Sequence, residues 1–380
     1  MAALAGVIGA VVAACMPGGS ASPDSPAPAS AGPEPSPTPS LSPAATPTTA
    51  ATQPNVAALR RKIGRMLVIG FRGTAPAPTE PFMQAIAAGE LGGVILFDRD
   101  GETQLAGRNI KSPDQLGALT GLLRSTALRG PIGPHLLIAV DQEGGRVARL
   151  NPTNGYPATP SAAELGAADD LERTTSAAVL TAITLAGAGI DFNLAPVVDL
   201  DVNPSNPAIG ALDRSFSAEP AVVVAQATAV IEALRGAGIR TAIKHFPGEG
   251  SATGNTDRGV VDVTATWTEA ELEPFRALIS ADLPSAVMVG GIVNGQLDAE
   301  HPAVLSRPTV TGLLRNQLGW SGVVISDDLQ APAVTERYGD GEAIALAIEA
   351  GVDLLLFANQ QVYDPDIVDH VATIVMDNLA

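Results

Sequence analysis

Residues 219–246 read EPAVVVAQATAVIEALRGAGIRTAIKHF, a helix-like segment followed by a strand-like one. Apolar residues recur at helical spacing over residues 219–237. Gly236 and Gly238 suit the end of a helix, where a residue without a Cβ often caps the last turn. The run 241–246 is short and largely aliphatic or β-branched at its start, as expected of a strand covered on both faces. The segment therefore predicts a helix that leads directly into a buried strand.

The same alternation of strands and helices continues along the chain in both directions. Seven further strand-like runs lie at residues 66–71, 93–97, 136–141, 192–200, 286–293, 323–327 and 353–358. Helix-like stretches lie between them, among them 161–188, 269–281 and 341–350. Alternation of this kind predicts a parallel sheet covered by helices.

Eight such strands favour an α/β fold of the closed (β/α)8 TIM-barrel type, with one catalytic domain over residues 55–380. An open doubly wound sheet is the alternative. It loses support because no GxGxxG motif follows a strand and no GxxxxGK[ST] motif is present. Because these nucleotide-binding loops are missing from the sequence, we expect no cofactor.

The first residues differ in character from the rest of the chain. Residues 1–14, MAALAGVIGAVVAA, are apolar but too few to span a bilayer as a helix, and they are typical of a secretory signal peptide. The run leads into Val12-Ala13-Ala14-Cys15, which resembles a bacterial lipobox whose cysteine receives a diacylglyceryl group. A signal peptide usually has a Lys or Arg before its apolar run, and this sequence has none there. An ordinary signal peptide with an incidental cysteine is the alternative.

A segment dominated by Pro, Ser, Ala and Thr follows the predicted signal peptide. Residues 16–54 carry no aromatic residue and too little apolar surface to offset the entropy of folding. Such a segment predicts a semi-extended tether. These features predict an exported protein, with a signal peptide and lipobox over residues 1–15 and a tether over residues 16–54. We expect lipid on Cys15 to hold the protein at the outer face of the cytoplasmic membrane.

Composition excludes several classes of partner. Lys and Arg total 22 against 40 for Asp and Glu, and the net charge of −18 repels the phosphate backbone of nucleic acids. Cys15 is the only cysteine, so the sequence allows neither an intrachain disulfide nor a cysteine-based zinc site. The four histidines show no metal-binding spacing, and no metal site is predicted. The sequence does not indicate an oligomeric state.

Polar residues follow four of the predicted strands at the point where each strand ends. They are 141–146 (DQEGGR), 199–201 (DLD), 244–248 (KHFPG) and 326–328 (SDD). A single charged residue at such a place can be an ion pair or a cap. Four strands with the same feature predict a polar pocket at the C-terminal face of the barrel, where the active sites of this fold lie.

The residue types in this pocket favour glycoside hydrolysis. The pocket offers several carboxylates and a Lys-His pair, but no thiol and no set of metal ligands. A glycosidase needs one carboxylate at the anomeric carbon, a proton donor and groups that bind hydroxyls. A serine hydrolase is disfavoured because no GxSxG motif is present.

Three motifs together resemble the family 3 β-N-acetylglucosaminidases. They are KHFPG at 244–248, VDQEGGRV at 140–147 and ISDDL at 325–329, and the likeness runs from about residue 60 to the C-terminus. The resemblance implies that Asp327 is the nucleophile of a retaining mechanism. It also implies five residues that bind a terminal N-acetylglucosamine, namely Asp141, Arg149, Arg214, Lys244 and His245. For Asp327 and the two arginines, structural ion pairs are the alternative.

The loop after KHFPG departs from the family pattern. Family members carry a further His there and then Asp-Ser-His, whose histidine is the acid/base. This chain has Glu249 in place of the first His and Asn255-Thr256-Asp257 in place of the second motif. Either Asp257 transfers the proton, with Glu249 near it and a raised pKa, or the loop has lost this role. We favour Asp257, because the replacement is itself titratable.

The resulting hypothesis is hydrolysis of terminal β-linked N-acetylglucosamine from a glycan or muropeptide of the cell wall. The N-acetyl preference rests on the resemblance alone, and β-glucosidase activity is an alternative. A catalytically weak or silent sugar-binding lipoprotein is the alternative from another class. Phosphorolysis is disfavoured, because an anionic Asp257 would repel phosphate.

Overall fold

The computed structural model describes residues 56–131, 133 and 135–378 of the chain. The predicted signal peptide, Cys15 and the predicted tether lie outside these residues. The described residues belong to one compact unit. None of their helices is long and apolar enough to cross a membrane.

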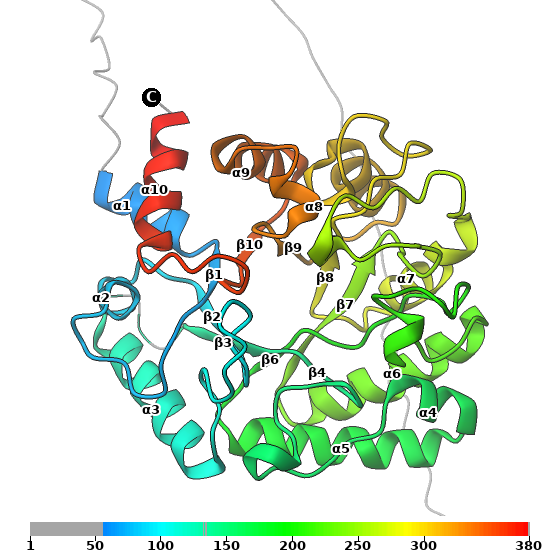
Figure 1. Ribbon diagram of the computed structural model, residues 1–380, viewed down its shortest axis with the longest axis horizontal. Helices are drawn as coiled ribbons and strands as arrows, with labels where there is room; N and C mark the ends of the chain where they lie inside the picture. The colour runs from blue at the N-terminus through cyan, green and yellow to red at the C-terminus, as the bar shows by residue number, and fades with distance from the viewer. Residues whose placement is uncertain (1–55, 132, 134, 379–380) are drawn as a thin grey trace, which may run out of the picture. The chain divides into compact units, whose positions relative to one another are not determined.

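Eight parallel strands close into a barrel, which confirms the predicted fold class. The strands are β1 (Leu67–Gly70), β2 (Gly93–Leu96), β3 (Leu137–Val140), β6 (Phe192–Asn193), β7 (Arg240–Phe246), β8 (Ala286–Val289), β9 (Val323–Asp328) and β10 (Leu354–Phe357). Their order around the barrel is β1-β10-β9-β8-β7-β6-β3-β2, so that the last strand pairs with the first. Figure 1 shows the strands at the centre with the helices around them. A small antiparallel ribbon of β4 (Gln142–Gly144) and β5 (Val147–Ala148) follows β3.

The fourth strand is much shorter than the predicted run 192–200. Its regular pairing ends at Asn193, and Pro196 lies shortly beyond it. Proline has no amide N–H to donate to a ladder, so the pairing loses its regular register there. A single bridge between Val197 and Lys244 continues the contact with β7.

Helices connect consecutive strands and cover the outside of the barrel. They are α1 (Val56–Gly64), α2 (Pro81–Ala88), α3 (Pro113–Arg129), α4 (Ala162–Ala168), α5 (Leu171–Gly187), α6 (Pro220–Gly236), α7 (Glu273–Ser280), α8 (Pro332–Thr335), α9 (Asp340–Ala350) and α10 (Ile367–Asn378). A π-helix spans Pro308–Gln317 between β8 and β9. The stretch 161–188, expected as one helix, is two. Asp169 takes a left-handed conformation that ends α4, and the Asp170 side chain accepts hydrogen bonds from two amides that begin α5.

The core has an inner and an outer layer. Apolar side chains from all eight strands point into the barrel, among them Val68, Ile95, Ala139, Phe192, Ala242, Met288, Ile325 and Leu356, all at most 4% exposed. Their neighbours along each strand point outward and pack against the helices, as Leu67 and Ile69 do. The alternation fixes which residues face the interior at the end of each strand.

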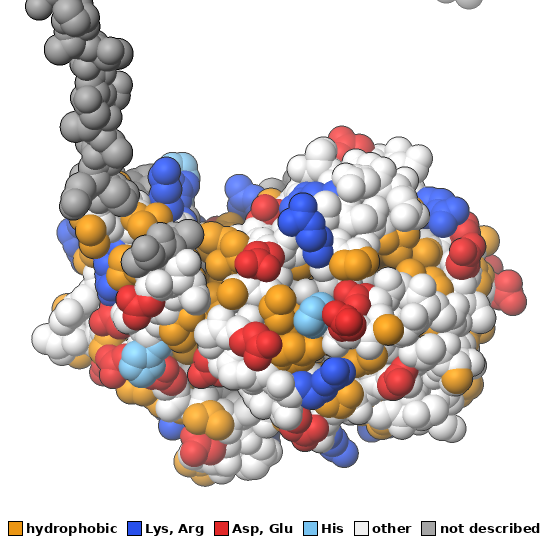
Figure 2. Space-filling view, turned by 90° about the horizontal axis from the view of Figure 1, so that it is seen from above, with side chains coloured by type: hydrophobic (Ala, Val, Ile, Leu, Met, Phe, Trp, Pro, Cys, Tyr) orange, Lys and Arg blue, Asp and Glu red, His pale blue; other side chains and the backbone are white. Residues whose placement is uncertain are grey.

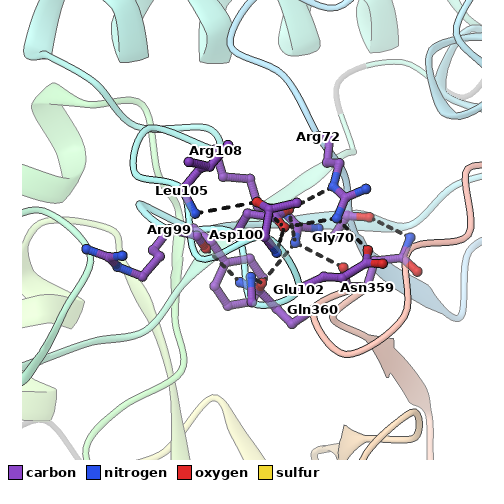
Figure 3. A network of polar contacts seen from close by, with 12 residues as sticks. Gly70, Arg72, Arg99, Asp100, Glu102, Leu105, Arg108, Asn359 and Gln360 are labelled. Carbon is purple, nitrogen blue, oxygen red and sulfur yellow. Dashed lines mark hydrogen bonds and ion pairs between the residues drawn. The ribbon is translucent and has the colours of Figure 1, made fainter.

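A network of polar contacts ties the loops after β1, β2 and β10 together where the barrel closes (Figure 3). The Arg108 side chain is 1% exposed and lies 3.2 Å from the Asp100 carboxylate. It donates hydrogen bonds to the carbonyls of Phe71 and Asn359. Burial lowers the pKa of Arg108, and the ion pair with Asp100 opposes that effect. The last strand is thereby joined to the first two above the level of the sheet.

Two helical glycines give opposite predictions for stability. A Cβ at Gly166 in α4 would lie 1.7 Å from the main-chain oxygen of Phe216, whereas a Cβ at Gly117 in α3 would meet nothing within 4 Å. We expect Gly166→Ala to lower the free energy of unfolding by about 1–3 kcal/mol through overpacking. We expect Gly117→Ala to raise it by about 0.5–1 kcal/mol, because alanine loses less backbone entropy on folding. Urea denaturation of both variants measures this, and equal stability of the two would contradict the packing described.

Candidate active site

A pocket of about 390 Å³ opens at the C-terminal ends of the strands. All eight pocket residues named from the sequence line it, which are Asp141, Arg149, Arg214, Lys244, His245, Glu249, Asp257 and Asp327. They come from loops or strand ends that are up to 186 positions apart in the chain, from Asp141 to Asp327. The structure thus brings together every residue expected to bind or cleave the sugar.

Strand alternation explains why the key side chains face the pocket. Ala139, Ala242 and Ile325 fill the interior of the barrel. Two residues further along the same strands come Asp141, Lys244 and Asp327, which therefore point the same way, one layer higher. The pocket floor is the next layer above the apolar filling of the barrel.

Lys244 binds two carboxylates at this floor. Its Nζ lies 2.7 Å from Asp141 Oδ1 and 2.7 Å from Glu143 Oε1, and its side chain is 3% exposed. Burial lowers the pKa of Lys244, but the two carboxylates outweigh that effect and the pKa is raised. Lys244 is therefore a fixed positive charge at the pocket floor.

Glu143 is a pocket residue that the sequence interpretation did not assign. Its carboxylate accepts two hydrogen bonds of 2.8 Å from Arg214, whose Nη1 donates to the Ala208 carbonyl at 2.8 Å. Burial raises the pKa of Glu143, but Arg214 and Lys244 outweigh it and hold the pKa far below its usual range. The signal for Glu143 was its place in the polar run 141–146 at the end of β3. Glu143 orients both cations toward the pocket.

Arg149 is held more loosely than Arg214. Its guanidinium nitrogens lie 3.8 Å from Asp141 and 4.0 Å from Asp98, and its side chain is 28% exposed. The guanidinium also lies over the Phe97 ring, 5.5 Å from the ring centroid. Because its ion pairs are long, Arg149 retains hydrogen-bonding capacity for a ligand.

Asp199 anchors the loop that follows β7. The side chain is fully buried and accepts hydrogen bonds from the amide of Glu249 at 2.9 Å, the amide of His245 and the Nδ1 of His245 at 2.7 Å. His245 Nε2 lies 3.4 Å from an Arg214 nitrogen. The Asp199 carboxylate therefore fixes the imidazole ring and the start of the loop together.

Glu249 lies behind His245, with its Oε1 3.4 Å from Nδ1 and its side chain 4% exposed. Burial and the nearby carboxylates of Asp199 and Asp327 raise the pKa of Glu249, while His245 opposes the shift. Ligand atoms of Asp199, His245 and Glu249 lie within 4.8 Å of one another, close enough for a metal ion. Both oxygens of Asp199 already accept hydrogen bonds, so a cation would have to replace the proton on Nδ1. The Asp199 carboxylate thus binds the His245 ring and two amides, whereas the Glu249 carboxylate lies 3.4 Å from Nδ1 and accepts no hydrogen bond from the described residues.

Asp327 lies at the end of β9 without a cationic partner. Across the described residues, no Lys, Arg or His nitrogen lies within 4.0 Å of its carboxylate. Its Oδ1 accepts a hydrogen bond from the amide of Asp328 at 2.8 Å. The ion-pair alternative therefore does not hold for Asp327, and its carboxylate is available to a ligand in the pocket.

Two further carboxyl groups stand near Asp327. Asp257 is exposed at the mouth of the pocket, on a short 3-10 turn spanning Thr256–Arg258. The surrounding protein displaces part of its water and the Asp327 carboxylate repels its charge, and both effects raise its pKa. Burial raises the pKa of Asp328 to about 7, although its Oδ1 accepts hydrogen bonds from the amides of Ala358 and Gln330. Several carboxyls near Asp327 are thus shifted toward the protonated state.

Outside the pocket, charge is spread rather than gathered on the face seen in Figure 2. Lys and Arg side chains lie apart from one another there, among acidic ones. A nucleic-acid site needs a basic patch or stripe, and this face does not present one.

Comparison with known proteins agrees with the resemblance drawn from the three motifs. Residues 58–378 match the model of the glycosyl hydrolase family 3 N-terminal domain. A β-hexosaminidase of Tolumonas auensis is 37% identical over 276 residues, which are 71% of this chain and 76% of that protein.

Solved structures of the same family superpose on the barrel. A β-N-acetylhexosaminidase from Beutenbergia cavernae matches with a TM-score of 0.74 and 33% identity over 84% of this chain and 91% of its own. A family 3 β-N-acetylglucosaminidase from Paenibacillus sp. matches with a TM-score of 0.75 and 32% identity over 84% of this chain, but only 58% of its own length. With its family domain, its pocket and its relatives in agreement, the chain belongs to glycosyl hydrolase family 3, as a glycoside hydrolase of the β-N-acetylhexosaminidase type.

Proposed function

We propose that this glycoside hydrolase releases terminal β-linked N-acetylglucosamine from cell-wall fragments by a retaining mechanism. The observation that carries the proposal is the Asp327 carboxylate, which is unpaired at the floor of a pocket lined by fixed cations. The substrate class rests on the names of the relatives, which are β-hexosaminidases and β-N-acetylglucosaminidases. Asp327 is the proposed nucleophile and Asp257 the proposed acid/base.

In the first step, an Asp327 oxygen bonds to the anomeric carbon as the bond from that carbon to the leaving oxygen breaks. The leaving oxygen takes the Asp257 proton, so that the leaving group departs as a neutral alcohol. In the second step, Asp257 removes a proton from water, and the water oxygen displaces Asp327 from the sugar. Both carboxyls then return to their starting protonation states.

The paired charges on the opposite side of the pocket suit the hydroxyls of the sugar. Lys244 and Asp141 offer a donor and an acceptor 2.7 Å apart, a spacing that vicinal hydroxyls can bridge. Arg149 adds N–H donors from the loop after β5, and His245 lines the pocket at the end of β7. Lys244 is already fixed by Glu143 and His245 by Asp199, so the sugar is bound with little reorganisation of these two side chains.

Asp257 suits proton transfer better than Glu249 does. Glu249 is 4% exposed behind the imidazole ring, whereas Asp257 lies at the mouth, where a leaving group passes out to solvent. Proton transfer to the leaving oxygen requires hydrogen-bond reach of that oxygen. A silent sugar-binding protein is the outcome to expect if neither group can reach it.

We expect Asp327→Asn to abolish turnover of a nitrophenyl β-N-acetylglucosaminide, because the amide is too weak a nucleophile. We expect Asp257→Ala to lower kcat about 10²-fold or more, the usual contribution of acid/base catalysis. Asp114→Ala, an exposed change in α3, is the control and should have wild-type rates. Undiminished turnover by Asp257→Ala would move the acid/base role to Glu249. If a β-glucoside is cleaved faster than the β-N-acetylglucosaminide, the proposed N-acetylglucosamine preference is wrong.

The raised pKa of Asp257 predicts an alkaline limit to activity. The group must be protonated to donate, and its pKa lies above the ordinary 3.8, so activity is lost as the pH rises through the raised value. Profiles of kcat/KM against pH should show this alkaline limb in the wild type and in Glu249→Gln, and lose it in Asp257→Ala. If the alkaline limb disappears in Glu249→Gln instead, the titrating group is Glu249.

We also propose that the protein is exported and held by lipid on Cys15 at the outer face of the cytoplasmic membrane. The support is the lipobox-like Ala13-Ala14-Cys15 and the long polar stretch that follows it. In a bacterial host, full-length protein should appear in the membrane fraction and partition into detergent, and Cys15→Ser should abolish the partitioning. Wild-type protein that remains in the aqueous phase would contradict the anchor.

A further inference from the structure

The proposed acid/base stands on a loop whose two ends are held differently. The start of the loop is fixed by Asp199, which binds the Glu249 amide, and by Asn206, which donates to the Glu249 carbonyl at 2.7 Å. Asp257 lies further along, where its own carboxyl accepts no hydrogen bond from the described residues. The position of that carboxyl therefore depends on how its main chain is held.

One side chain reaches this main chain from across the pocket mouth. Gln361 Nε2 donates to the Asp257 carbonyl oxygen at 3.3 Å, and both residues line the pocket. Gln361 follows β10, whereas Asp257 follows β7, so the bond joins two walls that the barrel places apart. Within the loop, Asn255 accepts from the Asp257 amide at 2.8 Å, but this contact moves with the loop itself.

The loop that carries Gln361 is firmly anchored. Asn359 is 1% exposed and donates to the Gly70 carbonyl at 3.0 Å and the Asp364 carbonyl at 2.9 Å. Its amide donates to Gln330 Oε1 at 2.8 Å. The buried Arg108 donates to the Asn359 carbonyl at 2.9 Å. These contacts tie the residue two positions before Gln361 to the loops after β1, β2 and β9.

Gln360 fastens the same loop at a second point, as Figure 3 shows. Its Oε1 accepts from Arg108 at 2.9 Å and from the amide of Gly101, and its Nε2 donates to the Arg99 carbonyl at 3.1 Å. Gln361 therefore extends from a support that is cross-linked to three neighbouring strand ends. A contact from such a support restrains the main chain of Asp257.

We propose that Gln361 is a positioning residue that holds the Asp257 carboxyl at the leaving-group side of the pocket. The inference rests on the proposed role of Asp257 as acid/base. Gln361 touches neither the sugar nor the reacting atoms in this account. Its effect is on the fraction of time that the acid spends within reach of the leaving oxygen.

A positioning role has a signature that general loss of structure lacks. Good leaving groups, such as dinitrophenolate, depart without a proton, whereas phenol and alcohols need one. Misplacing the acid should therefore slow the hydrolysis of substrates with poor leaving groups more than that of substrates with good ones. Damage to the sugar site or to the fold would slow both alike.

The experiment measures kcat/KM for aryl β-N-acetylglucosaminides with leaving groups from dinitrophenol to phenol, since this quantity reports the first step. For Gln361→Ala we expect a loss of about 2–10-fold with phenol, as for one hydrogen bond, and less than about 2-fold with dinitrophenol. Gln361→Glu keeps the shape but removes the donor, and its loss with phenol should be at least as large. Gln84→Ala is the matched control, because Gln84 is also exposed and donates to a carbonyl at 3.2 Å, in α2.

Asp257→Ala, measured beside these variants, separates the two claims. A leaving-group-dependent loss in Asp257→Ala and in both Gln361 variants supports the inference. The inference is overturned if Asp257→Ala shows this loss but Gln361→Ala has wild-type rates, or is slowed equally for every leaving group. The proposed function would then still stand. No leaving-group dependence in Asp257→Ala overturns both. Thermal melting curves of all variants check that each is folded.

Discussion

The pocket depends on the alternation of side chains along the parallel strands that close into a barrel. Once Ala139, Ala242 and Ile325 point inward to fill the barrel, the residues two positions later must also point inward, where the apolar filling ends. A carboxylate, a cation and a second carboxylate stand at these places. A one-residue slip of any of these strands would bury its charge against the helices, so the register that packs the core also assembles the site.

Charge pairing then divides the carboxylates of the pocket into two groups. Asp141 and Glu143 share Lys244 at 2.7 Å, and Glu143 also binds Arg214 at 2.8 Å. The nearby cations outweigh burial and hold the pKa of each carboxyl below its usual range. Asp327 has no such partner among the described residues, and its charge adds to burial in raising the pKa of Asp257 and Glu249. The first group is held by cations, and the second is not. Similar residues thus acquire different roles from their neighbours alone.

Local pattern was enough to predict the eight strands, the barrel and a polar pocket at its C-terminal face, because buried strands and polar strand ends leave a signal in consecutive positions. The eight individual pocket residues came from the resemblance to the family. Local pattern did not predict features that depend on a single residue within a regular run or on contacts between residues far apart in the chain. The early end of β6 near Pro196 and the break at Asp169 each depend on one residue inside an otherwise regular run. Glu143 gains its role from Arg214 and Lys244, which lie 71 and 101 positions away. The contact between Gln361 and Asp257 joins two loops 104 positions apart, and neither loop contains a pattern that indicates it.

In the proposed mechanism, Asp257 serves both steps of the reaction because its pKa responds to the charge on Asp327. Burial raises the pKa of Asp257, and the Asp327 anion raises it further by repulsion, which favours the protonated form that an acid requires. In the proposed intermediate Asp327 is an ester of the sugar, so that negative charge is gone and the repulsion ends. The pKa of Asp257 then falls by the part that Asp327 contributed, which favours the anionic base that must accept a proton from water. The proposed nucleophile thus shifts the pKa of its partner in the direction that each step requires, provided that the loop keeps the two carboxyls close.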